Sequence, residues 1–598
     1  MDKVKSFFID AEQSTARQHI VNQTYEFDSN QVCQFIHQPT CIGDNAVLVG
    51  ADVFEDLELF KPYRDGCVPV MDAIDKTLLR GSRVYMQHLL SHPIHCVELL
   101  QKRQELLKAL KPSTASMECL RTMQSSELDV LWLFENPSDN IKSLQEMVYF
   151  RFWVTKHLNN VGAALSTYNI YRMVLSPLIG IISPVVYFIV PFLVLRFRYG
   201  LKLPFKTYIN VLFQSSGMLF KLNGWSDNLK YCSYVFTLLF YFQSAINSVE
   251  VSRTLYCMTD YIISKVNNIS KFISSGNALV QEHSSTINEV ANIFYGVTLE
   301  ASGAVINPPT QLRDVWEKWW IASNFGSLLS FYKNIDKKAV SDLLSHVYMI
   351  DTLCSISSLK NDMNYGYVDY VHDSKPKLHL VGAWHPSIAN AIPNDTIIGV
   401  HMPNNAVITG PNAGGKSTMI KSVVLNTLLA QTLTVCCGQS FCMTPFAFIN
   451  TQINIPDCKG KESLFQAEMN RCKNNIDVTK SMGENKFSLI VMDEIFNSTS
   501  PVEGIAAAYA VAAHLGRLPR VVMLFTTHYS YLTKLAKTMA FTNYKMNVRM
   551  LPGGRFEYPY KMKRGISRQH IALDLLETNG FDAALIAEAK EIRDKLCV

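Results

Sequence analysis

The stretch ITGPNAGGKST, Ile408–Thr418, decides the fold of the last third of the chain. It fits the pattern G-x-x-x-x-G-K-[ST], in which backbone N–H groups hold phosphates at the start of a helix. Apolar residues 406–408 before it suit a strand, and KSTMIKSVVLNTLLAQ after it suits a helix. This context predicts a phosphate-binding loop, in which Lys416 reaches the β- and γ-phosphates and Ser417 binds magnesium. The fixed positions of the pattern are Gly410, Gly415, Lys416 and Ser417.

Two further strands are expected to complete the site. The apolar run SLIVMDE ends in Asp493, which would hold the metal ion, and Glu494, which would polarise the attacking water. The run RVVMLFTTH ends in Thr526, Thr527 and His528, where the histidine can sense the γ-phosphate through a hydrogen bond. A purely structural role for these polar side chains is the alternative interpretation.

The pattern of apolar residues differs between the last third of the chain and the region before it. Apolar runs alternate with helical stretches in the last third, which predicts a mostly parallel sheet with helices on both faces. Residues 248–359 are polar, have helical periodicity and contain few Gly or Pro, which predicts long helices. The expected fold class is therefore multidomain α plus α/β.

Composition excludes few classes of function. The net charge of +5 over 598 residues neither demands nor excludes a nucleic-acid partner. The 14 cysteines form no C-x-x-C pair, which favours reduced, mostly buried thiols over a zinc site. The N-terminal residues show no secretory signal, so we expect an intracellular, reducing compartment.

One segment departs from this pattern. Residues 173–195 contain no charged side chain, and a second apolar run covers residues 231–246. The first run is long enough to cross a bilayer as a helix, but residues 196–230 between the runs carry six basic residues against Asp227 alone, which argues against a simple membrane hairpin. Membrane insertion of residues 173–246, and a buried or interfacial apolar element, both stay open.

The motifs resemble those of the MutS family, whose members are dimeric ATPases of the ABC class. TGPNAGGKST resembles the family's phosphate loop, TTHY its switch histidine, and DEIFNSTSPVEG its acidic strand with the following loop. GKESLFQAEM resembles the signature segment that contacts the neighbouring subunit's nucleotide, with Ser463 and Glu468 at the matching positions. In the loop after the acidic strand, the matching positions are Thr499, Ser500, Glu503 and Gly504.

The resemblance continues outside the ATPase region. LELF and MDAIDKTLLRGSRVYMQHLLSHPI resemble the start of the MutS core domain, and the last residues suit two helices around an Asn579-Gly580 turn that help subunits associate. This implies four parts. They are an N-terminal segment (1–52), a helical core, lever and clamp region (53–380) with the apolar insert 173–246, a P-loop ATPase domain (381–565) and a C-terminal helical dimerisation element (566–598).

The resemblance also assigns site residues and partners. ATP and Mg²⁺ are the implied cofactors, with catalytic roles for Lys416, Glu494 and His528 and metal binding by Ser417 and Asp493. The implied partners are duplex or branched DNA and a second subunit, and the pathway is DNA repair or recombination. The residues expected to bind the nucleotide are Gly410, Pro411, Asn412, Ala413, Gly414, Gly415, Lys416, Ser417, Thr418 and Ser463.

Some family features are missing. Mismatch sensors carry a Phe-x-Glu wedge in a separate N-terminal domain, whereas here Phe54 and Phe134 are followed directly by Glu and the core pattern begins near residue 57. The aromatic residue expected just before Pro393 is also absent, which puts adenine preference in doubt. A DNA clamp without the wedge is the main hypothesis. A membrane-tethered ATPase acting on a protein or on membrane-proximal DNA, and a nucleotide-binding scaffold with little turnover, are the alternatives.

Overall fold

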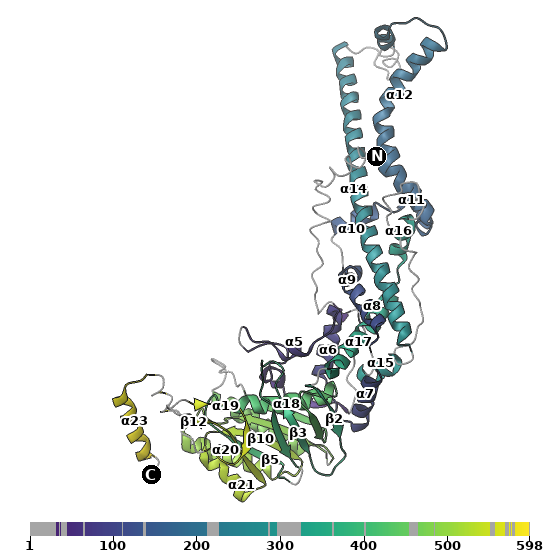
Figure 1. The fold of residues 1–598 in the computed structure, drawn as a ribbon. Helices are drawn as coiled ribbons and strands as arrows, with labels where there is room; N and C mark the ends of the chain where they lie inside the picture. Colours follow the sequence, from purple (N-terminus) through teal and green to yellow (C-terminus); the bar gives the residue numbers. More distant parts are fainter. Residues whose placement is uncertain are drawn as a thin grey trace. The chain divides into compact units, whose positions relative to one another are not determined.

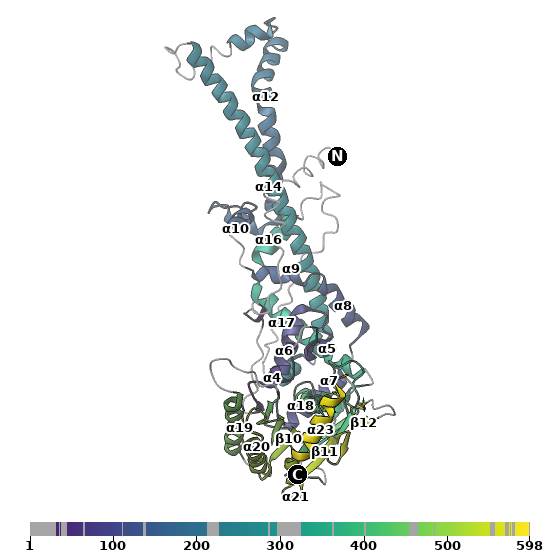
Figure 2. The ribbon, with the colours of Figure 1, turned by 90° about the vertical axis from the view of Figure 1, so that its left-hand side faces the viewer.

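Figures 1 and 2 show the computed structural model of the chain. The chain divides into two compact units, one of residues 29–120, 279–303 and 344–598, the other of residues 1–28, 121–278 and 304–343. The structure describes residues 32–34, 36, 45–63, 66–110, 112–135, 139–211, 227–284, 287–295, 325–361, 364–399, 402–453, 464–483, 485–550, 556–567, 573, 576 and 580–596.

A seven-stranded sheet forms the centre of the first unit. Its strands, in spatial order, are β1 (Leu48–Val49), β8 (Phe448–Gln452), β9 (Ser488–Asp493), β10 (Val521–Thr527), β5 (Asn405–Thr409), β11 (Phe541–Met546) and β14 (Met562–Arg564). All neighbouring strands are parallel except β11 and β14. The three strands expected from the sequence are therefore confirmed as β5, β9 and β10, and they are adjacent.

Helices cover both faces of this sheet, as the alternating pattern predicts. On one face, the side chains of Ile490, Met492, Met523 and Phe525 pack in a buried cluster with the alanines of α20 (Pro501–Gly516). Figure 1 shows α18 (Lys416–Thr432) on the other side of the strands. The remaining helices here are α19 (Leu464–Ser481), η7 (Ser530–Lys534), α21 (Leu535–Thr538) and α23 (Ala583–Leu596). The first of the two expected C-terminal helices lies mostly outside the described residues.

Smaller sheets flank this core. A five-stranded sheet has the order β4 (Asn394–Ile398), β3 (Leu378–Ala383), β7 (Ser440–Met443), β2 (Gly366–Tyr370) and β6 (Val435–Cys436). A two-stranded sheet pairs β12 (Arg549–Met550) with β13 (Phe556–Glu557). The segment after β13 leads into the pocket described below.

The region that resembles the start of the MutS core packs as helices. Both carboxylate oxygens of Asp351 accept from the backbone N–H of Leu78, and one accepts from Leu79, which satisfies donors at the start of α6. A Cβ on Gly81 would lie 2.2 Å from Cζ of Tyr348, so only glycine allows this approach. The helices are α4 (Val53–Asp56), α5 (Val70–Ile74), α6 (Arg80–Ser91), α7 (Val97–Ala109), α8 (Thr114–Gln124), α15 (Ile287–Tyr295) and α17 (Lys337–Asn361).

The second unit is helical. Its buried core includes Leu165, Leu255, Ile262 and Leu328. Its elements are α9 (Glu127–Leu131), η3 (Trp132–Phe134), α10 (Asp139–Glu146), η4 (Lys156–Asn160), α11 (Gly162–Ile170), the π-helical turn η5 (Tyr171–Leu175), α12 (Ser176–Phe197), α14 (Asp227–Glu282) and α16 (Phe325–Asn334). The long helices predicted for residues 248–359 are confirmed in α14 and α17, while residues 296–324 lie outside the described ones.

The two apolar runs fall on α12 and on the first part of α14 (Figures 1 and 2). Many of their large apolar side chains are exposed rather than buried, including Ile179 and Phe236. Across the part of the chain that the structure describes, no helix combines the length and apolar character needed to cross a membrane.

Candidate nucleotide-binding site

The candidate site lies at the edge of the large sheet where β5, β9 and β10 end. Thr526 of β10 pairs with Ile408 of β5 on one side and with Asp493 of β9 on the other. The carboxyl ends of parallel strands meet at one edge, where α/β proteins bind their ligands. The phosphate loop, the two acids and His528 therefore come together although they are far apart in the sequence.

The loop after β5 has a backbone suited to anions. Ala413 and Gly415 take the left-handed region, with φ of 62° and 89°, which glycine adopts without strain. Helix α18 starts at Lys416, and no side chain in the described part of the chain caps it. Its first N–H groups are thus available to an anion, and the helix dipole favours negative charge there.

Lys416 is almost fully buried, at 4% exposure. Its Nζ donates to the carbonyl oxygens of Gly410 (3.1 Å) and Pro411 (3.3 Å), and it lies 3.2 Å from Oε1 of Glu494 and 3.1 Å from Nε2 of His528. A buried ammonium is stable only with such partners. An arriving phosphate would replace the carboxylate as its counter-ion.

Glu494 and His528 form the other half of this cluster. Oε1 of Glu494 lies 2.6 Å from Nε2 of His528. Burial raises the pKa of the Glu494 carboxyl, but the hydrogen bond and charge of His528, together with the charge of Lys416, outweigh burial and hold this pKa below its usual 4.5. The carboxylate is therefore ionised at neutral pH, as a group that accepts a proton from water must be. Its backbone φ of 49° is unusual for a non-glycine residue, and such strain is common at functional sites.

Asp493 and Ser417 are the residues predicted to bind the metal ion. The hydroxyl of Thr526 donates a short hydrogen bond to Oδ1 of Asp493 and thereby fixes this carboxylate at the end of β9. Ser417 is half-buried in the first turn of α18. Within the described residues, no group of three or more His, Cys, Asp or Glu side chains could hold a metal ion alone.

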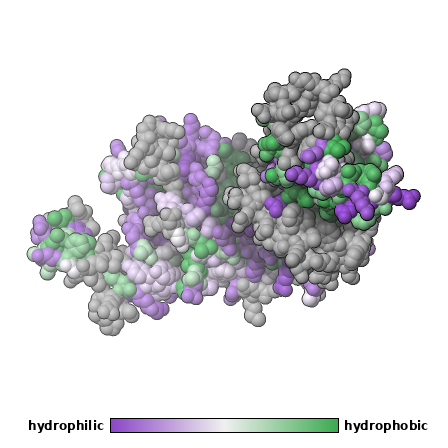
Figure 3. All heavy atoms as spheres, turned by 90° about the horizontal axis from the view of Figure 1, so that it is seen from above, coloured by the Kyte–Doolittle hydropathy of each residue, from purple (hydrophilic) through white to green (hydrophobic). Residues whose placement is uncertain are grey.

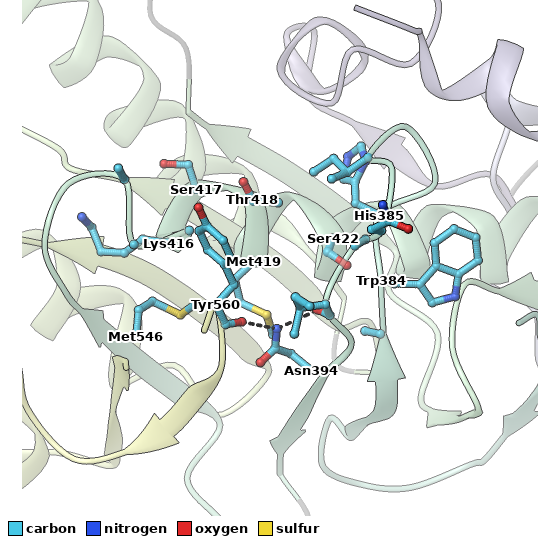
Figure 4. A pocket seen from close by; sticks show the side chains of 18 of the residues that line it. Trp384, His385, Asn394, Lys416, Ser417, Thr418, Met419, Ser422, Met546 and Tyr560 are labelled. Atoms are coloured by element: carbon cyan, nitrogen blue, oxygen red, sulfur yellow. Dashed lines mark hydrogen bonds between the residues drawn. The ribbon is translucent and has the colours of Figure 1, made fainter. Parts of the chain in front are cut away.

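A pocket of about 550 Å³ opens beside the loop. In Figure 4, Lys416 and Met546 lie toward one end, Trp384 and His385 toward the other, and the ring of Tyr560 between them. The size and the mixture of apolar, aromatic and polar walls suit a nucleotide.

Tyr560 is the residue that sequence reasoning missed. We expected an aromatic ring just before Pro393 and found none, but the ring of Tyr560 enters the same pocket from the segment after β13. Asn394 positions it, since its side chain donates to the carbonyl oxygen of Tyr560 (2.9 Å) and accepts from the N–H of Met562 (2.8 Å). The repeated aromatics of FEYPY were the available signal, but their link to Asn394 spans 166 residues.

His385 forms part of the far wall of the pocket. Burial, and then the charge of Lys421, lower the pKa of this imidazole to about 4, although Glu58 acts in the opposite direction. His385 is therefore neutral at physiological pH. The ion pair between Lys421 and Glu58 (3.0 Å) ties α18 to the chain after α4.

The predicted signature segment is only partly described. Ser463 lies outside the described residues, so its predicted role is not tested. Glu468, on α19, is buried and accepts a hydrogen bond from the hydroxyl of Ser498 (2.8 Å). Burial raises the pKa of Glu468. Gly504 of the neighbouring loop motif lets α20 pack closely, because a Cβ there would lie 2.4 Å from the carbonyl oxygen of Phe496.

Most of the predicted nucleotide-binding residues line the pocket beside the phosphate loop. The carbonyl oxygen of Gly410 accepts from Nζ of Lys416, His528 contacts the carboxylate of Glu494, and Asp493 pairs with Thr526 of β10. The predicted residues that line the pocket are Pro411, Asn412, Ala413, Gly414, Gly415, Lys416, Ser417, Thr418 and Glu494.

A strand, a glycine-rich loop and a helix, beside a strand that ends in acids, define the P-loop nucleotide-binding fold. Comparison with known proteins narrows this class, since residues 406–597 match the model of MutS domain V. The chain is 30% identical over 285 residues to the DNA mismatch repair protein MSH3 of Meyerozyma guilliermondii, which covers 45% of this chain and 29% of that protein.

Two other relatives give the same result. Similarity to the DNA mismatch repair protein MutS of Acetivibrio thermocellus is 30% identity over 255 residues, covering 41% of this chain and 28% of the relative. Similarity to the DNA mismatch repair protein MSH2 of Zea mays is 28% over 305 residues, covering 45% and 32%. The chain thus matches about a third or less of the length of these relatives.

Proposed function

We propose that the chain is a MutS-like ATPase that binds ATP with Mg²⁺ and hydrolyses it. One observation carries the proposal: a buried lysine, an ionised glutamate and a histidine meet within 3.2 Å at the end of a phosphate-binding loop. The match of residues 406–597 to MutS domain V supports it.

The residues divide the work as follows. The N–H groups at the start of α18 and the Nζ of Lys416 bind the β- and γ-phosphates and offset their charge. Glu494 accepts the proton of the attacking water. His528 contacts the carboxylate of Glu494 and orients this carboxylate. Ser417 and Asp493 would hold Mg²⁺, which neutralises charge on the phosphate oxygens. Tyr560 would stack on the base.

The test of hydrolysis uses the complete chain. We expect Mg²⁺-dependent release of phosphate from ATP, which the Lys416→Ala variant loses. Lys102, exposed on α7, provides the matched control, so Lys102→Ala should keep the parent rate. Equal turnover in Lys416→Ala and the parent would refute the proposed site.

The proposal includes a dimer that shares its two sites. The resemblance places Ser463 against the nucleotide of the neighbouring subunit, so each site would combine the loop of one chain with the signature segment of the other. Chains with Lys416→Ala and chains with Ser463→Arg should each be inactive, whereas mixed dimers regain one working site. Verified mixed dimers without activity would exclude a shared site.

We propose duplex or branched DNA as the partner, because the names of the similar proteins link them to DNA mismatch repair. Without a Phe-x-Glu wedge, recognition would rest on phosphate contacts and DNA shape, so affinity should fall steeply with salt. Titration of labelled duplex and four-way DNA at several salt concentrations measures this. Binding that is absent at low salt would contradict a DNA partner.

A membrane-tethered form of the same ATPase is the second candidate. No comparison supports it, and it is favoured only by the exposed apolar side chains of α12 and α14. An intracellular, reducing location is likewise a proposal.

A further inference from the structure

Helix α12 and the first part of α14 expose far more apolar surface than a water-facing helix pair normally does. On α12, the exposed fraction is 56% for Ile179, 56% for Ile181 and 44% for Val194. On α14 it is 71% for Phe236 and 69% for Phe240. Contiguous exposed apolar surface of this kind marks a contact site.

The exposed apolar side chains on α12 are not confined to one stripe. With about 100° between successive residues of a helix, Ile181, Leu178, Ile179 and Val194 spread over roughly 220° of its circumference. A helix that docks on a protein uses an apolar stripe about 100° wide, whereas a helix that is apolar on most sides needs apolar surroundings on most sides. The geometry favours a fluid apolar medium over a single protein groove.

The two helices splay apart toward their outer ends, as Figures 1 and 2 show. Two contacts join this pair: the hydroxyls of Ser183 on α12 and Tyr241 on α14 lie 3.0 Å apart, and Ser252 of α14 donates to the carbonyl oxygen of Met173 in η5, just before α12. The splay leaves apolar side chains of both helices uncovered within the part of the chain that the structure describes. Seen from above in Figure 3, hydrophobic side chains gather here beside hydrophilic ones.

Charge identifies the partner's chemistry. Residues 147–226 contain no Asp or Glu, and residues 173–195 and 231–249 contain no charged residue at all. The chain after α12 presents Arg198, Lys202 and Lys206, all exposed, and Arg196 at the end of α12. Phe192 packs edge-on against Phe205 (5.1 Å) and so fixes the segment that carries these cations.

A second copy of this chain is a poor occupant. Pairing of the same surface from two copies would bring two basic clusters together, and Asp227 is the only acid among residues 147–249 to offset them. Negatively charged lipid headgroups offer the complementary charge, and acyl chains offer apolar contact on all sides.

We propose that α12 and the first part of α14 insert into an anionic lipid surface. Ile179, Ile181 and Phe236 contact acyl chains, and Lys202 and Lys206 extend to the phosphates of the headgroups. Contact of this kind does not require that either helix cross the bilayer. The proposal is independent of ATP hydrolysis and of DNA.

The test is flotation of the purified full-length protein with vesicles, without ATP or DNA. Vesicles of phosphatidylcholine with phosphatidylglycerol should carry the protein to the top of the gradient. The double variant Phe236→Glu with Phe240→Glu should reduce flotation at least tenfold. The double variant Lys202→Glu with Lys206→Glu should lose at least tenfold of its binding to the anionic vesicles, while its weaker binding to phosphatidylcholine alone stays unchanged.

A matched pair controls for the introduced charge. Val235 on α14 and Val68, remote in sequence, are 57% and 51% exposed. Val235→Glu should weaken flotation, and Val68→Glu should not. Circular dichroism and ATP turnover, measured on every variant, show separately whether the fold and the proposed ATPase survive.

Two results would overturn the proposal. One is flotation that is equal in the parent and in the Phe236→Glu, Phe240→Glu variant. The other is absence of flotation together with oligomers, detected by sedimentation, that this variant dissociates, since a second copy would then cover the surface.

Discussion

Replacement of Glu494 by glutamine should separate binding of ATP from its hydrolysis. The depressed pKa of this carboxyl means that the substitution removes a full negative charge at neutral pH. Glutamine keeps the size of the side chain but cannot accept a proton from water. Loss of a transition-state contact of this kind costs about 3 kcal/mol, or roughly a hundredfold in turnover.

The affinity of the Glu494→Gln variant for ATP should rise, although its turnover falls. Before a phosphate reaches Nζ of Lys416, the ion pair with Glu494 (3.2 Å) must break. With Lys416 only 4% and Glu494 30% exposed, a partly solvated pair of this kind contributes about 1 kcal/mol. Its removal should therefore tighten ATP binding about fivefold.

Two assays check this split. Phosphate release under saturating ATP reports turnover, and equilibrium dialysis with labelled ATP reports affinity. Glu105→Gln, the same change at an exposed position of α7, should leave both unaltered. Turnover at the parent rate would show that Glu494 is not the base, and weaker ATP binding would refute the competition between carboxylate and phosphate for Lys416.

Three further predictions follow from the same structure. Tyr560→Ala should weaken ATP binding about tenfold with little effect on turnover at saturation, because base stacking contributes about 1–3 kcal/mol. Tyr560→Phe should retain the parent affinity in the same dialysis assay. His385 has a pKa near 4 when folded and 6.5 when unfolded, so the unfolded chain binds the extra proton and stability falls as pH drops from 6.5 toward 4. Urea midpoints should show that the free energy of unfolding is about 2 kcal/mol lower at pH 5 than at pH 7, and the His385→Gln variant should not show this difference. A single G·T mismatch should gain less than about threefold over matched duplex in a titration at equal salt, and a tenfold preference would reveal a wedge elsewhere in the protein.

Sequence reasoning succeeded where the information is local. The strands β5, β9 and β10 are short apolar runs with polar residues only at their ends, and helix α18 follows its glycine-rich loop directly. These features predict that Lys416 begins a helix and that Asp493 ends a strand, as α18 and β9 confirm, while the catalytic roles of Lys416 and Glu494 stay predictions. The parallel register of β5, β10 and β9 then places the ends of these strands at one edge of the sheet.

The sequence could not supply contacts between distant segments. Tyr560 reaches the pocket only because Asn394 holds its backbone, and no local pattern connects the two residues. The neutral state of His385 depends on burial by several elements, which a histidine in GAWHPSI does not reveal. The apolar insert shows the same limit, since a charge-free run is compatible with a core, a membrane or an interface. The exposed side chains of α12 and α14 argue only against the core.

Binding of ATP by the complete chain tests the central claim most directly. Isothermal titration calorimetry with Mg²⁺ present should show one saturable nucleotide site per chain. The Lys416→Ala variant should lose that signal, while Lys102→Ala should keep it. Equal ATP binding by the parent and by Lys416→Ala would contradict the assignment of the loop Ile408–Thr418 as the phosphate-binding element.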